Sequence, residues 1–326
     1  MTDALRKHGR GLLVFAVAAY ALPLLLAGNR YFAFIGGIAL LHVVWTAGMS
    51  LLYGYAGLMP LMFAGIAGIS AYAAVGLMAA GFAFWTALPV AALFAALVGV
   101  GLGLPALRLK GFYFTLCSLV IQTVITLAFV YFVNLTNGDT GISQIAPPAW
   151  FGGPLQGVGF DLVLATLAVG AMVALVLIVE APFGRRLVAV REDDELAEML
   201  GIDVVRQKLA AFFVGSLFAA VGGAFYAPYV GFVSPRSFDV LLSLNIWLMV
   251  AFGGRGTIWG AVVGTVLLAP LPFLLQDYYK VKDVIYGLLI IGVIVLLPGG
   301  ILGGLGSRAA AGTGTQSPGL RRKEAA

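Results

Sequence analysis

Residues 31–53 read YFAFIGGIALLHVVWTAGMSLLY, and no Asp, Glu, Lys or Arg occurs from residue 31 to residue 107. An apolar helix of about 20 residues spans the hydrocarbon core of a bilayer, because each residue adds about 1.5 Å. Further uncharged stretches lie at 111–138, 162–179, 209–235, 240–254, 256–276 and 284–307. Core helices of soluble proteins are shorter and keep a polar face, so the sequence predicts an integral membrane protein.

The composition is typical of an integral membrane protein. Of the 326 residues, 61% are hydrophobic and 10% are charged, and the mean hydropathy is +1.03. The net charge of +5 does not point to a nucleic-acid partner, because the basic residues lie between apolar stretches rather than along one soluble face. The single cysteine, Cys117, cannot form an intrachain disulfide and is interpreted as a small core residue.

The apolar stretches predict an all-α, polytopic membrane helix bundle with about ten transmembrane helices, and with eight as the lower bound. The helices are placed at 11–28, 32–53, 60–80, 84–104, 112–133, 162–180, 209–230, 238–253, 257–275 and 284–303. Two of these segments also fit re-entrant or half helices: 60–80 is rich in Gly and starts at a proline, and 238–253 is short.

The basic residues indicate how the bundle is oriented. With ten crossings and a cytoplasmic N-terminus, 15 of the 19 Lys and Arg residues fall on the inner side. Cytoplasmic loops carry such an excess, so both termini are expected in the cytoplasm of a bacterial inner (plasma) membrane. Arg6, Lys7 and Arg10 precede the first apolar run, which has no convincing cleavage site and is interpreted as an uncleaved helix.

Residues 1–306 form the predicted transmembrane domain, which contains two long connections. The segment 134–160 is rich in Gly, Pro and Asn and is expected to be an external loop that forms a docking surface. The segment 181–208 is dense in charge and is expected on the cytoplasmic side. Residues 307–326 are rich in Ala, Gly and Thr with basic residues near the end, and they are expected to be a disordered cytoplasmic tail.

The sequence contains no motif for enzyme chemistry. It has two histidines and no HExxH, paired cysteines or GxSxG, so no metal site, catalytic triad or cofactor is predicted. No lysine follows a glycine, so the core of a Walker A loop is missing and any ATP hydrolysis must occur on another polypeptide. The predicted spans lack charged residues, which argues against a proton- or sodium-driven carrier.

Neutral polar residues are the candidates for a translocation path. Thr115, Ser118, Gln122 and Thr126 are spaced by three, four and four residues, so they share one face of a helix. Such a stripe either lines a path for a zwitterion or another polar solute, or it hydrogen-bonds to neighbouring helices.

Two further features lie nearer the C-terminus. Ser243 and Asn245 have the same two interpretations, because an Asn amide in hydrocarbon requires a partner or water. A GxxxGxxxG ridge is formed by Gly256, Gly260 and Gly264. It indicates close packing between helices of the chain, and a contact with another subunit is the more specific alternative.

The cytoplasmic segment 184–208 reads GRRLVAVREDDELAEMLGIDVVRQK. Its acidic run precedes leucine and methionine residues and Gly201 is a stop signal, so a short amphipathic helix near 193–201 is expected. A helix held beneath the membrane with an apolar face is suited to a groove on a cytoplasmic partner. The candidate contact residues are Asp193, Asp194, Glu195, Leu196, Ala197, Met199, Leu200 and Gly201.

This segment resembles the cytoplasmic coupling loop of ABC-importer permeases of the branched-chain amino-acid type. Glu195, Ala197 and Gly201 stand in the places of that family's Glu-Ala-Ala…Gly pattern. Other blocks are similar to the family and occur in the same order, so the likeness runs from about residue 40 to residue 303. They are GYAG at 54–57, LPALRLKGFYF at 104–114, SPRSF at 234–238 and GGRGTIWGAVVGT at 253–265.

The resemblance implies a permease subunit that works with partners. It implies a second permease chain, identical or different, two cytoplasmic ATPase subunits, and a periplasmic or lipid-anchored substrate-binding protein. It places Glu195 to Gly201 at the ATPase contact and 134–160 on the face that meets the binding protein. The implied mechanism is alternating access driven by closure of the ATPases.

The chain also departs from the family pattern. GLMPLMFAGI at 57–66 stands where the family has the polar GQLSLGHAAF, and Asn245 stands where a Glu is common. Such a lining suits a less polar or uncharged solute. The leading hypothesis is a permease for branched-chain or related amino acids. Urea, an amide or an aromatic compound is the alternative solute, and a stand-alone channel or secondary carrier is the alternative class.

Overall fold

The computed structural model describes residues 2–109, 111–150 and 153–274, together with 287, 292 and 300–302. Within these residues, seven helices are long and apolar enough to cross a membrane, and two shorter apolar helices, Phe63–Ala79 and Gly260–Leu274, accompany them. The predicted all-α polytopic bundle is confirmed. The count of ten spans stays a prediction, because the segment 284–303 lies almost wholly outside the described residues, as does the whole of 307–326.

The helices, in chain order, are α1 (Thr2–Leu26), α2 (Arg30–Met49), α3 (Phe63–Ala79), α4 (Phe84–Leu107), α5 (Phe112–Tyr131), α6 (Val133–Thr136), α7 (Val158–Glu180), α8 (Pro182–Glu192), α9 (Asp194–Met199), α10 (Val204–Val230), α11 (Val240–Gly253), α12 (Gly260–Leu268) and α13 (Leu271–Leu274). A π-helical turn, Ser50–Tyr55, continues α2, and 3₁₀ turns occupy Gly138–Thr140 and Pro235–Phe238. The short strands are β1 (Ile142–Ser143), β2 (Ala149–Trp150), β3 (Gly153–Pro154) and β4 (Phe232–Val233).

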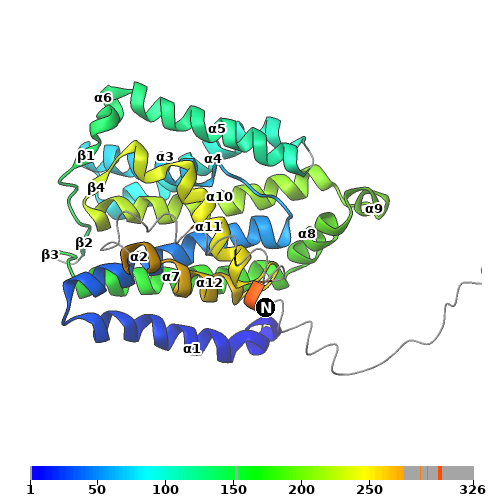
Figure 1. Cartoon of the computed structure of the whole chain (residues 1–326), viewed down its shortest axis with the longest axis horizontal. Coiled ribbons are helices and arrows are strands. Elements are labelled where there is room, and N and C mark those ends of the chain that lie inside the picture. The colour runs from blue at the N-terminus through cyan, green and yellow to red at the C-terminus, as the bar shows by residue number, and fades with distance from the viewer. Residues whose placement is uncertain are drawn as a thin grey trace, which may run out of the picture.

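The connections between the long helices gather at two opposite ends of the bundle (Figure 1). At one, the strand end, β1 pairs with β4 and β2 pairs with β3, both antiparallel. At the other, the α9 end, α8 and α9 extend away from the long helices, and the start of α1 lies at this same end. The segments predicted as an external loop, 134–160, and a cytoplasmic loop, 181–208, therefore lie at opposite ends of the molecule.

The centre of the bundle is packed through small residues. α3 lies against α4 and α10, and a Cβ atom at Gly223 of α10 would overlap the backbone of Ala67 in α3. The fully buried Trp45 of α2 donates its indole N–H to the carbonyl oxygen of Ala219 at 3.1 Å. Close approach of this kind stabilises membrane helices through van der Waals contact, because surrounding lipid supplies no hydrophobic driving force.

Two helices, α3 and α11, begin inside the bundle rather than at one of its ends. α3 starts after the non-helical stretch 56–62, and α11 starts after the turn Pro235–Phe238. Both starts lie beside the middle of α5, where the side chain of Gln122 bonds to each of them. Irregular backbone at membrane depth is tolerated only where protein satisfies its polar groups, and Gln122 does so here.

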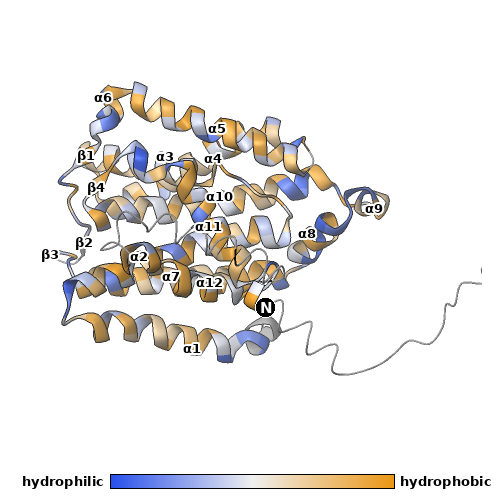
Figure 2. Cartoon of the chain, viewed as in Figure 1, coloured by the Kyte–Doolittle hydropathy of each residue, from blue (hydrophilic) through white to orange (hydrophobic). Residues whose placement is uncertain are grey.

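The long helices are mostly apolar along their middle parts, and polar residues collect towards the ends of the bundle (Figure 2). Many of these apolar side chains are exposed on the outside of the bundle. On α5, for example, Val120, Val124 and Leu127 are 62%, 57% and 61% exposed. Side chains of this kind would be unfavourable in water, so they mark surfaces for lipid or for another membrane subunit.

Candidate functional site

The short helix α9 is built by local signals at both of its ends. Asp193 is the N-cap, and its carboxylate accepts hydrogen bonds from the backbone N–H groups of Glu195 at 2.9 Å and Leu196 at 3.1 Å. Gly201 follows the helix with φ of +81°, and the N–H groups of Gly201 and Ile202 donate to the carbonyl oxygens of Glu198 and Ala197, as in a Schellman motif. The acidic start and the glycine stop thus fix the length of α9.

One side of α9 is held against its neighbours. Ala197 is buried and packs with Val190 of α8 and Val204 of α10. Asp194 forms an ion pair with Lys208 of α10, and both side chains are largely shielded from solvent. These contacts attach α9 to α8 and α10, so that it moves with them.

The other side of α9 presents apolar side chains to solvent. Leu196, Met199 and Leu200 are 56%, 83% and 71% exposed. The helix α9 itself lies beyond the ends of the long helices (Figure 1). We refer to Leu196, Met199 and Leu200 as the α9 face.

Arg191, at the end of α8, joins the α9 segment to two glycine-rich turns. Its guanidinium donates to the carbonyl oxygen of Gly54 in the π-helical turn. A Cβ atom at Gly57 would lie 2.9 Å from Arg191 Cγ, and one at Gly256 would lie 3.0 Å from Nη1. The side chain therefore lies between the turn that leads into α3 and the turn that joins α11 to α12.

The sequence does not reveal this role of Arg191. The residue stands inside the cytoplasmic segment 184–208, where it is one basic residue among many. It also pairs with Glu192, and that hydrogen bond and charge lower the pKa of Glu192 below its ordinary value. The available signal was the presence of two glycine blocks, GYAG and GGRG, which leave room for a large side chain from elsewhere.

The polar stripe predicted on α5 meets the start of α3. The backbone N–H of Leu61 donates to Ser118 Oγ at 2.9 Å, and that of Gly65 donates to Gln122 Oε1 at 2.7 Å. From α11, Ser243 Oγ accepts from the N–H of Ala64 at 2.8 Å. These side chains satisfy backbone donors that a helix start leaves without intrahelical partners. All three are buried.

The remaining candidates for the path surround this cluster. Gln122 Nε2 donates to the carbonyl oxygen of Phe238 at 2.8 Å and lies 3.3 Å from Thr126 Oγ1. The carbonyl oxygen of Thr115 accepts from Ser118 Oγ at 2.7 Å. Asn245 lies on α11 and is partly exposed. The stripe thus holds the starts of α3 and α11 against α5, and Ser118, Gln122 and Ser243 do not line an open channel in this conformation.

The three glycines predicted to form a packing ridge fall into two places. A Cβ atom at Gly264 would overlap the backbone of Met249 in α11, and one at Gly260 would lie 2.7 Å from the carbonyl oxygen of Gly254. Gly256 precedes α12 and has φ of +74°, in the turn beside Arg191. Gly260 and Gly264 therefore bring α11 and α12 together, while Gly256 shapes the turn between them.

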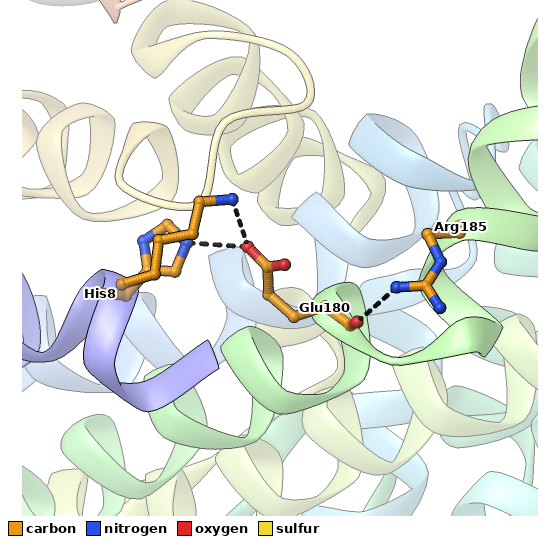
Figure 3. Close-up of polar contacts among 4 residues, drawn as sticks. His8, Glu180 and Arg185 are labelled. Atoms are coloured by element: carbon orange, nitrogen blue, oxygen red, sulfur yellow. Dashed lines mark hydrogen bonds and ion pairs between the residues drawn. The ribbon is translucent and has the colours of Figure 1, made fainter. Parts of the chain in front are cut away.

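The start of α1 is tied to the junction of α7 and α8 by a polar cluster (Figure 3). Glu180 Oε1 accepts from Lys7 Nζ at 2.9 Å and lies 2.9 Å from His8 Nε2. Arg185 Nη1 donates to the carbonyl oxygen of Glu180 at 3.3 Å. The cluster places the basic start of the chain at the α9 end.

The prediction that the spans lack charged residues is wrong for α7. This helix begins at Val158 rather than at residue 162, so it includes Asp161, whose side chain is buried. Glu180 closes the same helix and is also the last residue of the predicted span 162–180. The predicted span starts four residues too late and so leaves out Asp161, the one carboxylate that the structure buries in a membrane-crossing helix among the described residues.

Residues 14–297 match the family model described as the permease component of branched-chain amino acid transport systems. The chain is 29% identical over 316 residues to the high-affinity branched-chain amino acid transport system permease protein LivM of Salmonella typhimurium and of Escherichia coli, an alignment that covers 89% of this chain and 74% of each relative.

A second permease of the same organism is also similar. The Escherichia coli permease protein LivH is 28% identical over 182 residues, which cover 53% of this chain and 59% of LivH. No solved structure matches the chain.

Proposed function

This chain belongs to the family of permease components of branched-chain amino acid transport systems, and we propose on that premise that it provides the membrane path of an ATP-driven importer for branched-chain or related amino acids. The observation that carries the proposal is the family match over residues 14–297, a range that starts within α1 and includes every later helix described above. The chain is a multi-pass membrane protein and a transport component.

In this proposal, energy reaches the permease through α9. Two cytoplasmic ATPase subunits engage the α9 face, one on each permease chain, and closure of the ATPases moves α9 together with α8 and α10. The support is an apolar face that is exposed outside the bundle while the opposite side of α9 is anchored through Ala197 and Asp194. A solvated loop has no need of such a face.

The orientation follows from charge. The α9 end, with the start of α1, faces the cytoplasm, and the strand end faces outward to meet a periplasmic or lipid-anchored binding protein. This arrangement leaves 15 of the 19 Lys and Arg residues of the ten-span topology on the cytoplasmic side. The binding protein would meet the region of β1 to β4, which forms the surface of that end.

The permease is proposed to act as a pair. The chain is similar to both LivM and LivH of Escherichia coli, which fits two related permeases in one importer. The exposed apolar face of α5 is a surface that a second permease can cover. Thr115, Ser118, Gln122, Thr126, Ser243 and Asn245 are proposed to line the path once the starts of α3 and α11 separate from α5.

Uptake by the reconstituted complex tests the proposed function. The tagged chain would be purified with the subunits that accompany it, placed in proteoliposomes with ATP on the α9 side, and supplied with binding protein and labelled leucine, isoleucine or valine. Uptake should require ATP and stop with a non-hydrolysable analogue. Uptake that continues without ATP would identify a channel or secondary carrier instead, and uptake of urea but not of amino acids would overturn the solute assignment.

A further inference from the structure

A cavity of about 630 Å³ opens at the strand end, away from the cluster around Gln122. It lies between the starts of α2 and α7 and the end of α10, and the loop before α7 forms one side. The residues that matter here are Arg30, Phe34, Phe160, Asp161 and Tyr229, all of which line it. A volume of this size is typical of sites for small molecules.

Asp161 is the buried acid of this cavity. The residue is 4% exposed, and its Oδ1 accepts a hydrogen bond from the hydroxyl of Tyr229 at 2.9 Å. Among the described residues, no Lys, Arg or His forms an ion pair with it. A carboxylate removed from water without a cation is costly, and within a membrane-crossing helix such a residue is a functional candidate by default.

The walls of the cavity are aromatic. The ring of Tyr229 stacks between Phe34, with centroids 5.6 Å apart and planes 3° apart, and Phe160, with centroids 5.3 Å apart and planes 11° apart. A Cβ atom at Gly37 would overlap the Tyr229 hydroxyl, so the glycine makes room for the contact with Asp161. The acid is therefore held at a fixed position beside apolar surface.

The rim of the cavity carries the opposite charge. Arg30 is exposed and begins α2. It forms no ion pair with a described residue. A buried carboxylate, an exposed guanidinium and aromatic walls together match one ligand class: a small zwitterion with an ammonium group, a carboxylate and an apolar side chain.

We propose that this cavity binds an apolar amino acid on the outer side of the permease, with its ammonium group on Asp161 and its carboxylate towards Arg30. The choice of an amino acid among ligands of this chemistry rests on the proposed function. The site shares no lining residue with the cluster of α3, α5 and α11, so it is a separate holding site rather than the closed path.

Equilibrium binding to the purified chain in lipid nanodiscs tests the proposal, with labelled leucine as the probe. Saturable binding is expected. The amine 3-methylbutylamine, which keeps the ammonium group, should compete, whereas 4-methylpentanoate, which lacks it, should not. Asp161→Asn should weaken leucine binding about thirtyfold or more, because it removes the charge from a buried pair. Asp139→Asn is the matched control, since Asp139 is an exposed acid at the same end.

Two variants at exposed rim residues keep the test independent of folding. Arg30→Gln should weaken binding of leucine but not of 3-methylbutylamine, and Gln156→Trp should block the opening, because Gln156 also lines the cavity. The thermal unfolding midpoint separates the two roles of Asp161. A purely structural acid predicts that Asp161→Asn destabilises the unliganded protein, whereas a ligand-binding acid predicts an unchanged or higher midpoint.

The failures of this proposal and of the proposed function are distinguishable. If the assembled importer carries leucine but the purified chain binds none, or if Asp161→Asn and Gln156→Trp bind leucine like the wild type, the site is overturned and the function stands. If the chain binds leucine through Asp161 but the importer carries only another solute, the proposed binding site is supported and the proposed substrate is refuted.

Discussion

The guanidinium of Arg191 donates a hydrogen bond to the carbonyl oxygen of Gly54, and this bond connects the segment that carries α9 to the end of α2. Gly54 lies in the π-helical turn that precedes the non-helical stretch 56–62 and the start of α3. A displacement of α9 thus has a direct route to the place where α3 meets the polar stripe of α5. Side-chain contacts of this kind can couple two elements that each have two arrangements.

Arg191→Lys is expected to uncouple ATP hydrolysis from transport while the protein stays folded. Lysine keeps the positive charge but lacks the planar fork that reaches Gly54 and Glu192 together. ATPase activity and leucine uptake should be measured on the same proteoliposomes. Arg206→Lys, at an exposed ion pair near the start of α10, is the control and should leave the ratio of uptake to hydrolysis unchanged. An unchanged ratio in Arg191→Lys would refute the connection.

Gly201→Ala is expected to impair coupling through backbone strain alone. Gly201 has φ of +81°, and no atom lies within 4 Å of a Cβ placed there, so the cost of about 1 kcal/mol comes from conformation and not from a clash. The same change at Gly81, in the turn between α3 and α4 with φ of +94° and equal space, is a matched control away from α9. Uptake should fall in the first variant and not in the second, and equal behaviour would remove α9 from the mechanism.

Leu196→Ser together with Met199→Ser is expected to weaken association with the ATPase. Both side chains are exposed in the permease alone, and burying each in a groove would contribute about 1.5–3 kcal/mol, so the double variant should bind more than tenfold more weakly. Leu135→Ser, an exposed leucine at the strand end, serves as the comparison. The readout is the amount of ATPase that co-purifies with each tagged permease, and similar yields from all three proteins would exclude the α9 face.

Gln122→Leu is expected to destabilise the bundle. The change leaves the N–H of Gly65 and the carbonyl oxygen of Phe238 without their partner inside the membrane, at a cost of about 1 kcal/mol or more for each group. Thr123→Val, on the exposed side of the same helix, should have little effect. Thermal unfolding in detergent measures both, and equal midpoints would mean that Gln122 does not anchor the starts of α3 and α11.

The sequence predicted most where the signals are local. The acidic N-cap Asp193 and the stop at Gly201 define α9 within a few residues, and the length of the apolar stretches fixes the all-α membrane class. The periodicity on α5 correctly put Ser118 and Gln122 on one face. It could not indicate that this face meets the start of α3, because that depends on segments 57 residues apart in the chain.

The residues that sequence analysis missed are those defined by distant contacts. Asp161 stands one residue before an uncharged stretch, and its burial depends on Tyr229, which is 68 residues away. In the sequence, Arg191 cannot be distinguished from the other arginines of a charged loop. Its role depends on Gly54, which is 137 residues away. Neither spacing leaves a periodic pattern, so only the folded arrangement reveals them.

The position of the α9 face is the central claim, and one cysteine at residue 199 tests it directly. In a Cys117→Ala background, Met199→Cys should react with a membrane-impermeant maleimide in inverted membrane vesicles but not in intact cells, and the assembled ATPase should block the reaction. Leu135→Cys should show the opposite sidedness and no protection. Labelling of residue 199 from outside the cell, or labelling from inside that the ATPase leaves unchanged, would contradict the account.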